Sequence, residues 1–130
     1  RDGTIDPLTA LAAVREWLNT ARDDAPAATT LAIFDGRRRY DLRVRLVDRR
    51  VARFASGPTP ILEVRLESEP IAGFDEESDA RRPITVLMSD DEVLVPLVMR
   101  TEVMGDLTAA LYTTRVCAEA SAERCREYRY

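Results

Sequence analysis

The side chains that could do chemistry in this chain are carboxylates, arginines and two cysteines, because its 130 residues contain no histidine. Histidine is the usual general base near neutral pH, the commonest zinc ligand and the middle member of a Ser/His/Asp relay. Its absence removes most familiar hydrolase mechanisms. We therefore predict that the chain is not an enzyme.

Carboxylates are clustered in two acidic stretches, either of which would be the place for a hard cation. One is Ser89 to Glu92 (SDDE), and the other spans Asp75 to Asp79 (DEESD). Turns favour the same residue types for their own backbone hydrogen bonds. We therefore interpret the first stretch as a turn and the second as part of a hydrated loop, and we predict no metal site.

A carboxylate-based hydrolase is the minor alternative, because the sequence singles out no pair of acids for it. The five glycines are scattered and form no phosphate-binding loop, so no cofactor is expected.

Cys117 and Cys125 are the only cysteines, and two thiols without histidine cannot complete a zinc site. Two arrangements are open for them. If 116–128 is one continuous helix, the sulfurs lie about 12 Å apart, which is too far for a bond. If 118–124 is a loop, a disulfide forms and stabilises the fold by about 2–3 kcal/mol. The composition of the segment favours the helix, whereas secretion would favour the disulfide.

Seven arginines lie in the stretch FDGRRRYDLRVRLVDRR, residues 34–50. An anion site would be built from Arg37, Arg38 and Arg39. The formal net charge of -4, however, gives no positive field that would collect nucleic acid, so no nucleic-acid partner is expected. We interpret the arginines as the solvent-exposed face of a strand, where they meet the glutamates of the next strand.

The element that opens the chain is a helix, predicted over Thr4 to Ala21. Asp6 is a good N-cap, and Pro7 suits the first helical position. Apolar residues recur at spacings of three and four and predict one buried stripe, made of Leu8, Leu11, Val14 and Leu18 with Trp17 beside it. The polar, alanine-rich segment Arg22 to Ala28 is predicted to be a linker.

From Thr29 onward the apolar period changes to two, which is typical of strands. Asp35-Gly36 predicts a tight hairpin, and a further hairpin is predicted around Asp48 to Arg50. Other turns are expected at 57–60, at 90–91 and at 105–106, with a polar loop over 70–82. A strand over 93–103 is interrupted by Pro96, which marks an edge, a bulge or a strand end. The inward residues of the first strands are predicted to be Tyr40, Leu42, Val44, Leu46, Leu62, Val64 and Leu66. Two further strands are predicted to begin with Ile84, Val86 and Met88 and with Leu107, Ala109 and Leu111.

These elements predict an α+β fold that is mostly β, with residues 1–130 forming a single domain. An N-terminal amphipathic helix packs on a curved antiparallel meander sheet of about six strands, as in a half-barrel. The concave apolar face of that sheet is predicted to be lined by Leu42, Val44, Leu62, Val64, Leu66 and Val86. No apolar run is long enough for a transmembrane segment.

Four segments in order resemble a bacterial envelope family of unknown function, DUF3108: DPLTALAAVR, IFDGRRRYDLRV, PIAGF and SDDEVLVPLVMRTEVMGDLTAAL. Members of that family look like secreted periplasmic proteins of Gram-negative bacteria. The resemblance implies a periplasmic location, and it implies that this chain corresponds to the C-terminal part of a longer protein, which agrees with its start at Arg1 rather than methionine. The family fold is similar, by analogy, to that of the periplasmic lipoprotein carriers.

Two functions are therefore expected to compete. The first is a non-catalytic envelope domain whose concave face binds a hydrophobic small molecule or lipid. The alternative is an assembly module that docks on another envelope protein through an exposed edge strand or through the polar tail that ends in Tyr128 and Tyr130.

Overall fold

The structure is a computed structural model that describes residues 4–34, 36–72, 83–104, 107–117 and 125–130. It begins with the two-residue strand β1 (Thr4–Ile5), followed by the helix α1 (Pro7–Ala21) and a short 3₁₀ turn, η1 (Arg22–Asp24). Asp6 caps the helix as predicted, because its side chain accepts a 2.9 Å hydrogen bond from the backbone N–H of Thr9. The predicted linker is shorter than expected, because β2 already starts at Ala27.

The buried face of α1 differs from the predicted stripe. Its buried residues are Ala10, Val14, Leu18 and Ala21, with Trp17 packed beside them. Leu11, predicted to be buried, is 64% exposed, and the side chain of Leu8 lies outside the described part of the structure. Both the predicted and the observed faces pass through Val14 and Leu18. The small residues Ala10 and Ala21 lie on the other side of Val14 and Leu18 from Leu11. On that side the helix lies close to the sheet.

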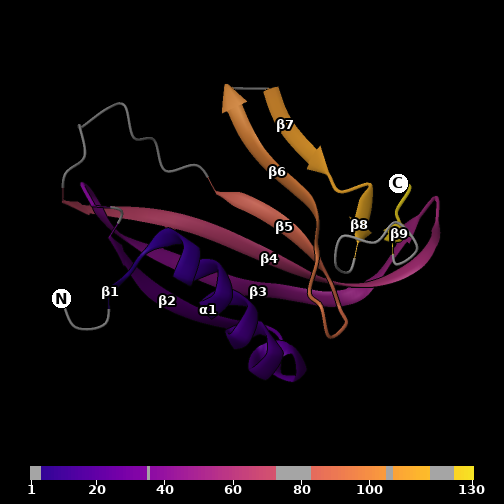
Figure 1. The fold of residues 1–130 in the computed structure, drawn as a ribbon, viewed down its shortest axis with the longest axis horizontal. Coiled ribbons are helices and arrows are strands. Elements are labelled where there is room, and N and C mark those ends of the chain that lie inside the picture. The colour runs from indigo at the N-terminus through magenta and orange to yellow at the C-terminus, as the bar shows by residue number, and fades with distance from the viewer. Residues whose placement is uncertain (1–3, 35, 73–82, 105–106, 118–124) are drawn as a thin grey trace.

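The predicted fold class is confirmed, because one helix packs on an open, mostly antiparallel sheet whose order follows the chain from β1 to β7. β1 pairs in parallel with β2, and every later neighbour is antiparallel. Figure 1 shows α1 lying along β2 and β3, with β6 and β7 rising away from it. The remaining strands of the sheet are β2 (Ala27–Phe34), β3 (Arg39–Phe54), β4 (Gly57–Ala72), β5 (Ile84–Ser89), β6 (Pro96–Met104) and β7 (Leu107–Tyr112).

The hairpin predicted around Asp48 to Arg50 is wrong, because β3 continues through these residues. The register shifts between Leu46, which pairs with Val64, and Asp48, which pairs with Glu63. Val47 is therefore the extra residue of a β-bulge. A bulge changes which side chains face the core. In the sequence, this break in the alternation of apolar and polar residues looks like the end of a strand.

The next turn lies earlier than predicted. Ala55 and Ser56 form it, and β4 starts at Gly57, which has a φ of 124° that suits glycine. Pro58 and Pro60 lie inside β4, but β5 pairs with β4 only from Ile61 onward. The prolines therefore lie just before the β4–β5 ladder, where a missing N–H breaks none of its hydrogen bonds. The carbonyl of Pro60 still accepts a 3.0 Å hydrogen bond from the backbone N–H of Asp90. At its other end β4 continues to Ala72, and the acidic stretch 75–79 and the turn at 105–106 lie outside the described residues.

Two apolar clusters lie on opposite faces of the sheet. The larger cluster joins α1 to β3, β4 and β5 and contains Leu18, Val44, Leu46, Leu62 and Val64. The smaller cluster contains Ile61, Leu87, Leu97, Val98 and Tyr128. Ile61 and Leu87 each directly neighbour in sequence a residue of the larger cluster, so they point to the other face.

The smaller cluster is covered by the C-terminal segment. This segment forms a separate two-stranded sheet of β8 (Arg115–Cys117) and β9 (Cys125–Glu127). It is joined to the turn between β3 and β4, because the backbone N–H of Ser56 donates a 3.0 Å hydrogen bond to the carbonyl of Arg129.

Candidate functional site

The apolar side chains on the side of the sheet that carries α1 form continuous rows across the strands. We call this side the helix face. One row is defined by the register of four strand pairs and consists of Leu46, Val64, Val86, Met99 and Leu111. A second row lies beside the first on the same face and consists of Val44, Leu66, Ile84, Thr101 and Ala109.

Burial along the helix face falls steadily from β3 to β7. Leu46 and Val64 are fully buried beneath the helix, Met99 is half-buried, and Leu111 is 69% exposed. Four residues of the predicted lining (Val44, Leu62, Val64 and Val86) belong to the core that packs on α1, and two (Leu42 and Leu66) are half-buried at its margin. The apolar face therefore extends beyond the area that the helix covers.

The exposed end of the helix face was not singled out by the sequence. Leu107 and Leu111 were predicted only to belong to the last strand, and both are exposed large hydrophobic residues. Every residue of β7 is exposed, and β7 is the last strand of its sheet. Only the cross-strand register, which brings Leu111 opposite Met99, reveals that these residues continue the core row.

The helix and the connection between β5 and β6 are held together by a group of ion pairs. The carboxylate of Asp90 accepts hydrogen bonds from Arg22 at 3.0 Å and from Arg49 at 2.7 Å. Arg49 also pairs with Asp23 at 2.7 Å. The Asp90 side chain is only 8% exposed, so these contacts join three distant segments in a partly buried environment.

The neighbouring residue Asp91 organises the turn itself. One of its carboxylate oxygens accepts hydrogen bonds from the hydroxyl of Ser89 and from the backbone N–H groups of Val93 and Leu94, at 2.9–3.0 Å. Leu94 is buried although its φ is 55°, and these hydrogen bonds fix that unusual conformation. The prediction that this acidic stretch is a turn is confirmed. In the described part of the chain, no group of three or more potential metal ligands is present.

The same contacts set the acidity of Asp91. Burial by itself would raise the pKa of the Asp91 carboxyl, but the hydrogen bonds from Leu94, Ser89 and Val93 outweigh it and hold the pKa below its ordinary value. The charged form of Asp91 is therefore part of the folded structure.

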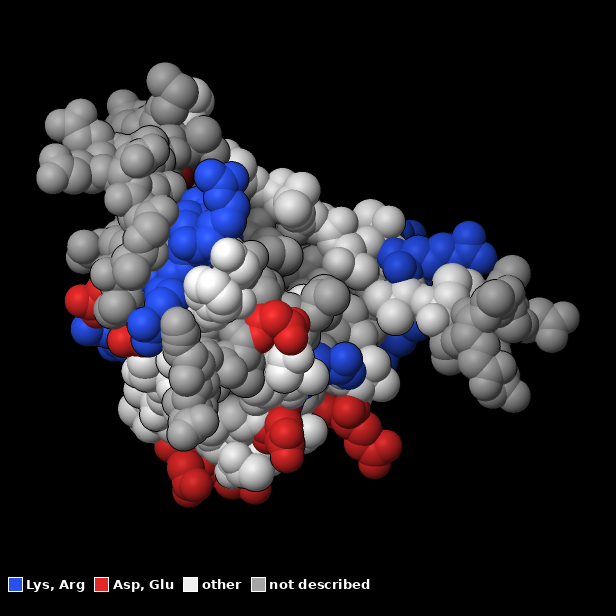
Figure 2. Space-filling model, turned by 60° about the vertical axis from the view of Figure 1, so that its left-hand side comes forward, with Lys and Arg blue, Asp and Glu red and all other residues white. Residues whose placement is uncertain are grey.

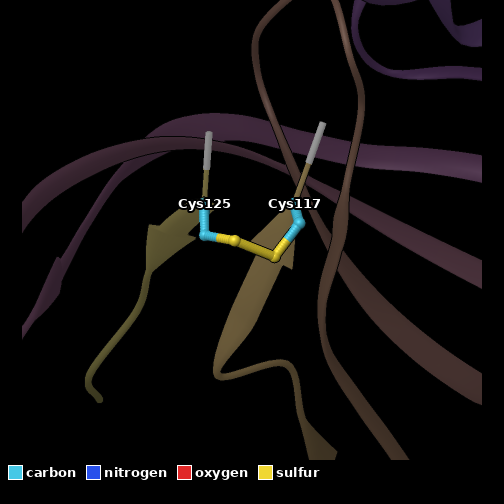
Figure 3. The surroundings of a disulfide bond; sticks show 2 residues. All are labelled: Cys117 and Cys125. Carbon is cyan, nitrogen blue, oxygen red and sulfur yellow. A yellow bond between two sulfur atoms is a disulfide. The ribbon is translucent and has the colours of Figure 1, made fainter. Parts of the chain in front are cut away.

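The C-terminal segment is closed by a disulfide between Cys117 and Cys125, which are directly paired across β8 and β9 (Figure 3). Of the two arrangements open for this segment, the structure thus has the cross-linked one. Tyr128 is 4% exposed. The hydroxyl of Tyr130 donates a 2.7 Å hydrogen bond to the carbonyl of Thr113, and its ring packs edge-on against Phe54. The tail that was predicted to be a free docking surface is engaged within the protein.

The opposite side of the sheet, which we call the outer face, carries most of the strand arginines. The predicted pairing with glutamates occurs between Arg43 and Glu69 at 2.6 Å and between Arg50 and Glu63 at 2.6 Å. Arg37 and Arg38 are exposed in the turn between β2 and β3 and are not without partners. Arg39 is the first residue of β3.

A family model described as a protein of unknown function (DUF3108) matches residues 1–111. Neither the curated proteins nor the solved structures contain a match to the chain. β8 and β9 lie beyond the matched residues. Within the described residues, no helix combines the length and the apolar character that crossing a bilayer requires.

Proposed function

The chain belongs to the DUF3108 family of proteins of unknown function, and we propose that it is a non-catalytic domain of the bacterial periplasm that binds a hydrophobic, lipid-like ligand. The ligand lies on the helix face beside α1, over β5, β6 and β7. The part of that face beneath α1 is already filled by the helix itself.

The observation that carries this proposal is the row from Leu46 to Leu111. A soluble protein normally ends its core with polar residues, and a contiguous exposed apolar surface is typical of a binding site. Here the row continues through Met99 to the 69% exposed Leu111, with Leu107 on the same face of β7. An acyl chain bound along this row would bury the apolar side chains that the helix leaves exposed.

The proposed compartment rests on the disulfide and on the resemblance to envelope proteins. Disulfides persist in oxidising compartments such as the periplasm and are rare in the cytosol. Cys117 and Cys125 account for both cysteines of the chain. Fractionation of cells, combined with alkylation of free thiols before and after reduction, tests this part: protein from the periplasm should take up label only after reduction.

The locations of the ionisable groups with shifted pKa values support the proposal that the domain is not catalytic. A catalytic acid or base usually has a perturbed pKa and lies in a cleft. Among the residues that the structure describes, the shifted carboxylate is Asp91, which is used by its own turn, and the shifted phenol is Tyr130, which is packed against Phe54. The proposed ligand surface is apolar.

The ligand proposal is tested by native mass spectrometry of the purified protein and by titration with the fluorescent hydrophobic probe N-phenyl-1-naphthylamine. The Leu111→Asp variant should lose most of the probe fluorescence and any co-purifying lipid. Val51→Asp is the matched control, because Val51 is 59% exposed at the far end of β3. Equal probe binding by the wild type and the Leu111→Asp variant, with both folded, would contradict the proposal.

A second candidate function is assembly with another envelope protein through the edge of β7. The last strand of the sheet has an exposed edge, and such edges accept a further strand. A concentration-dependent change in sedimentation, or a partner recovered by crosslinking through β7, would favour assembly over ligand binding.

A further inference from the structure

Three arginines lie in one row across the outer face. Arg45 on β3 is directly opposite Arg65 on β4, Arg65 is opposite Thr85 on β5, and Thr85 is opposite Arg100 on β6. Neighbouring strands are about 4.8 Å apart, so Arg65 and Arg100 flank Thr85 at a separation of about 10 Å. Blue side chains form a column on one face of the molecule in Figure 2.

Two arginines of this row, Arg45 and Arg100, are not neutralised by a carboxylate among the described residues. Arg43, Arg49 and Arg50 each pair with at least one carboxylate. Arg45 and Arg100 have no ion pair with any residue that the structure describes, and Arg65 contacts Glu67 through its Nε atom at 3.1 Å. Like charges directly opposite each other destabilise a sheet, so the pairing of Arg45 with Arg65 costs stability, which the exposed contact between Arg65 and Glu67 offsets only in part.

The outer face is hollowed where the row crosses β4, β5 and β6. The hollow has a volume of about 240 Å³. Besides Arg65 and Arg100, the hydroxyl-bearing residues Thr85 and Thr108 line it, and neither hydroxyl has a hydrogen-bond partner within the described residues. Two guanidinium groups and two hydroxyls thus lie around one concave surface.

We propose that this hollow binds a phosphate group, with Arg65 and Arg100 as its charged ligands and Thr85 between them as a hydroxyl donor. Guanidinium groups donate two parallel hydrogen bonds to a phosphate, and charge-assisted bonds of this kind are the strong ones. The site lies on the face opposite the proposed hydrophobic surface, so it is independent of that function. The phosphate belongs either to a lipid head group or to a free phosphorylated compound.

Glu102 also lines the hollow and is the group that would compete with a phosphate for Arg100. It lies two residues from Arg100 on the same face of β6, and no ion pair joins the two in the described structure. An adjacent smaller hollow of about 110 Å³ is lined by Arg43 and by Glu67 and Glu69. Because Arg43 is already neutralised by Glu69, the phosphate site is limited to the Arg65 and Arg100 side of the face.

The test is a titration of the ¹⁵N-labelled full chain with inorganic phosphate, followed by NMR. Saturable shifts should centre on the amides of Thr85 and Arg100, and Arg100→Gln should weaken binding by about tenfold. Glu102→Gln should strengthen binding, because it removes the competing carboxylate. Arg53→Gln is the charge-matched control, since Arg53 is an exposed arginine at the far end of β3, and it should bind phosphate as the wild type does.

Vesicles distinguish the two sources of the phosphate. The full chain is sedimented with vesicles of phosphatidylcholine alone or with added phosphatidylglycerol. Retention on the second kind only, lost in Arg100→Gln and kept in Arg53→Gln, assigns the site to a lipid head group; phosphate binding without retention assigns it to a soluble phosphorylated compound. Absence of both, or equal losses in Arg100→Gln and Arg53→Gln, would overturn the proposal. Arg100 has no ion pair in the described structure, so its substitution should leave the spectrum of the free protein dispersed.

Discussion

Arg22 Nη1 lies 3.0 Å from Asp90 Oδ1, although the two residues are 68 positions apart in the chain. This contact connects η1, the end of the helical segment, with the connection between β5 and β6. Arg49 approaches the other oxygen of the same carboxylate from β3. Asp90 therefore helps to hold α1 over the sheet, together with the packing of Val14 and Leu18 in the larger cluster.

Substitution of Asp90 by asparagine should destabilise the protein by about 2–3 kcal/mol, because it leaves two guanidinium groups without their shared carboxylate in a partly buried place. Chemical denaturation of the two proteins at neutral pH measures the difference. The same variant should bind the hydrophobic probe differently from the wild type, since α1 loses one of its attachments to the sheet.

Asp23→Asn is the control for that experiment. Asp23 pairs with the same Arg49, but its side chain is 81% exposed, and solvent-exposed ion pairs contribute less than about 1 kcal/mol. A loss in Asp23→Asn as large as that in Asp90→Asn would show that burial of the carboxylate has no role.

The stability of the fold should depend on the charge of Asp91 at acidic pH. Its pKa is lowered in the folded protein, so its contribution is fully present above the ordinary aspartate pKa of about 3.9 and is lost as the pH falls through the folded value. Asp91→Asn keeps an acceptor oxygen but cannot titrate. Denaturation curves between neutral and acidic pH should therefore show a shallower acid-side loss for this variant than for the wild type.

A second variant checks the role of the hydrogen bonds themselves. Asp91→Ala removes the acceptor for Ser89, Val93 and Leu94 and should cost about 1–3 kcal/mol already at pH 7. If Asp91→Ala were as stable as the wild type, the turn would not need the carboxylate to hold the positive φ of Leu94.

Reduction of the disulfide should loosen the C-terminal segment while the main sheet stays folded. The bond closes a short loop, whose cross-link contributes about 2–3 kcal/mol, and the segment covers the smaller apolar cluster through Tyr128. Hydrogen exchange of the reduced protein should speed up at β8 and β9 and change little at β3 and β4. Uniformly faster exchange throughout the chain would contradict the prediction that the C-terminal segment loosens while the main sheet stays folded.

The sequence predicted the central strands well because their pattern is local. Residues 40–46 and 62–66 alternate between apolar and charged side chains, and one buried face is enough to fix their direction. The N-cap at Asp6 was equally local, since it depends on a residue and its third neighbour. Helix class, strand class and meander order therefore followed from short windows of sequence.

The features that were missed depend on partners far along the chain. The bulge at Val47 is defined by its register against Val64 and Glu63. The exposed end of the helix face became visible only through the pairing of Met99 with Leu111. The arginine row likewise needs the register of four strands, because a single strand shows only an ordinary solvent-exposed arginine. Composition alone also left the cysteine segment open between a helix and a loop closed by a disulfide.

The two leucines Leu11 and Leu18 give a direct test of the observed helix face. Both fit the spacing of an apolar stripe, but Leu18 is fully buried in the larger cluster, whereas Leu11 is 64% exposed. Leu18→Ala should cost about 2–5 kcal/mol by removing core contacts and leaving a cavity, while Leu11→Ala should change stability by less than about 0.5 kcal/mol. The two variants delete the same atoms from the same helix, so helix propensity is matched between them. Similar unfolding midpoints for both would mean that α1 lies on the sheet with the stripe that the spacing alone predicts, and the area of helix face left open to a ligand would then be different.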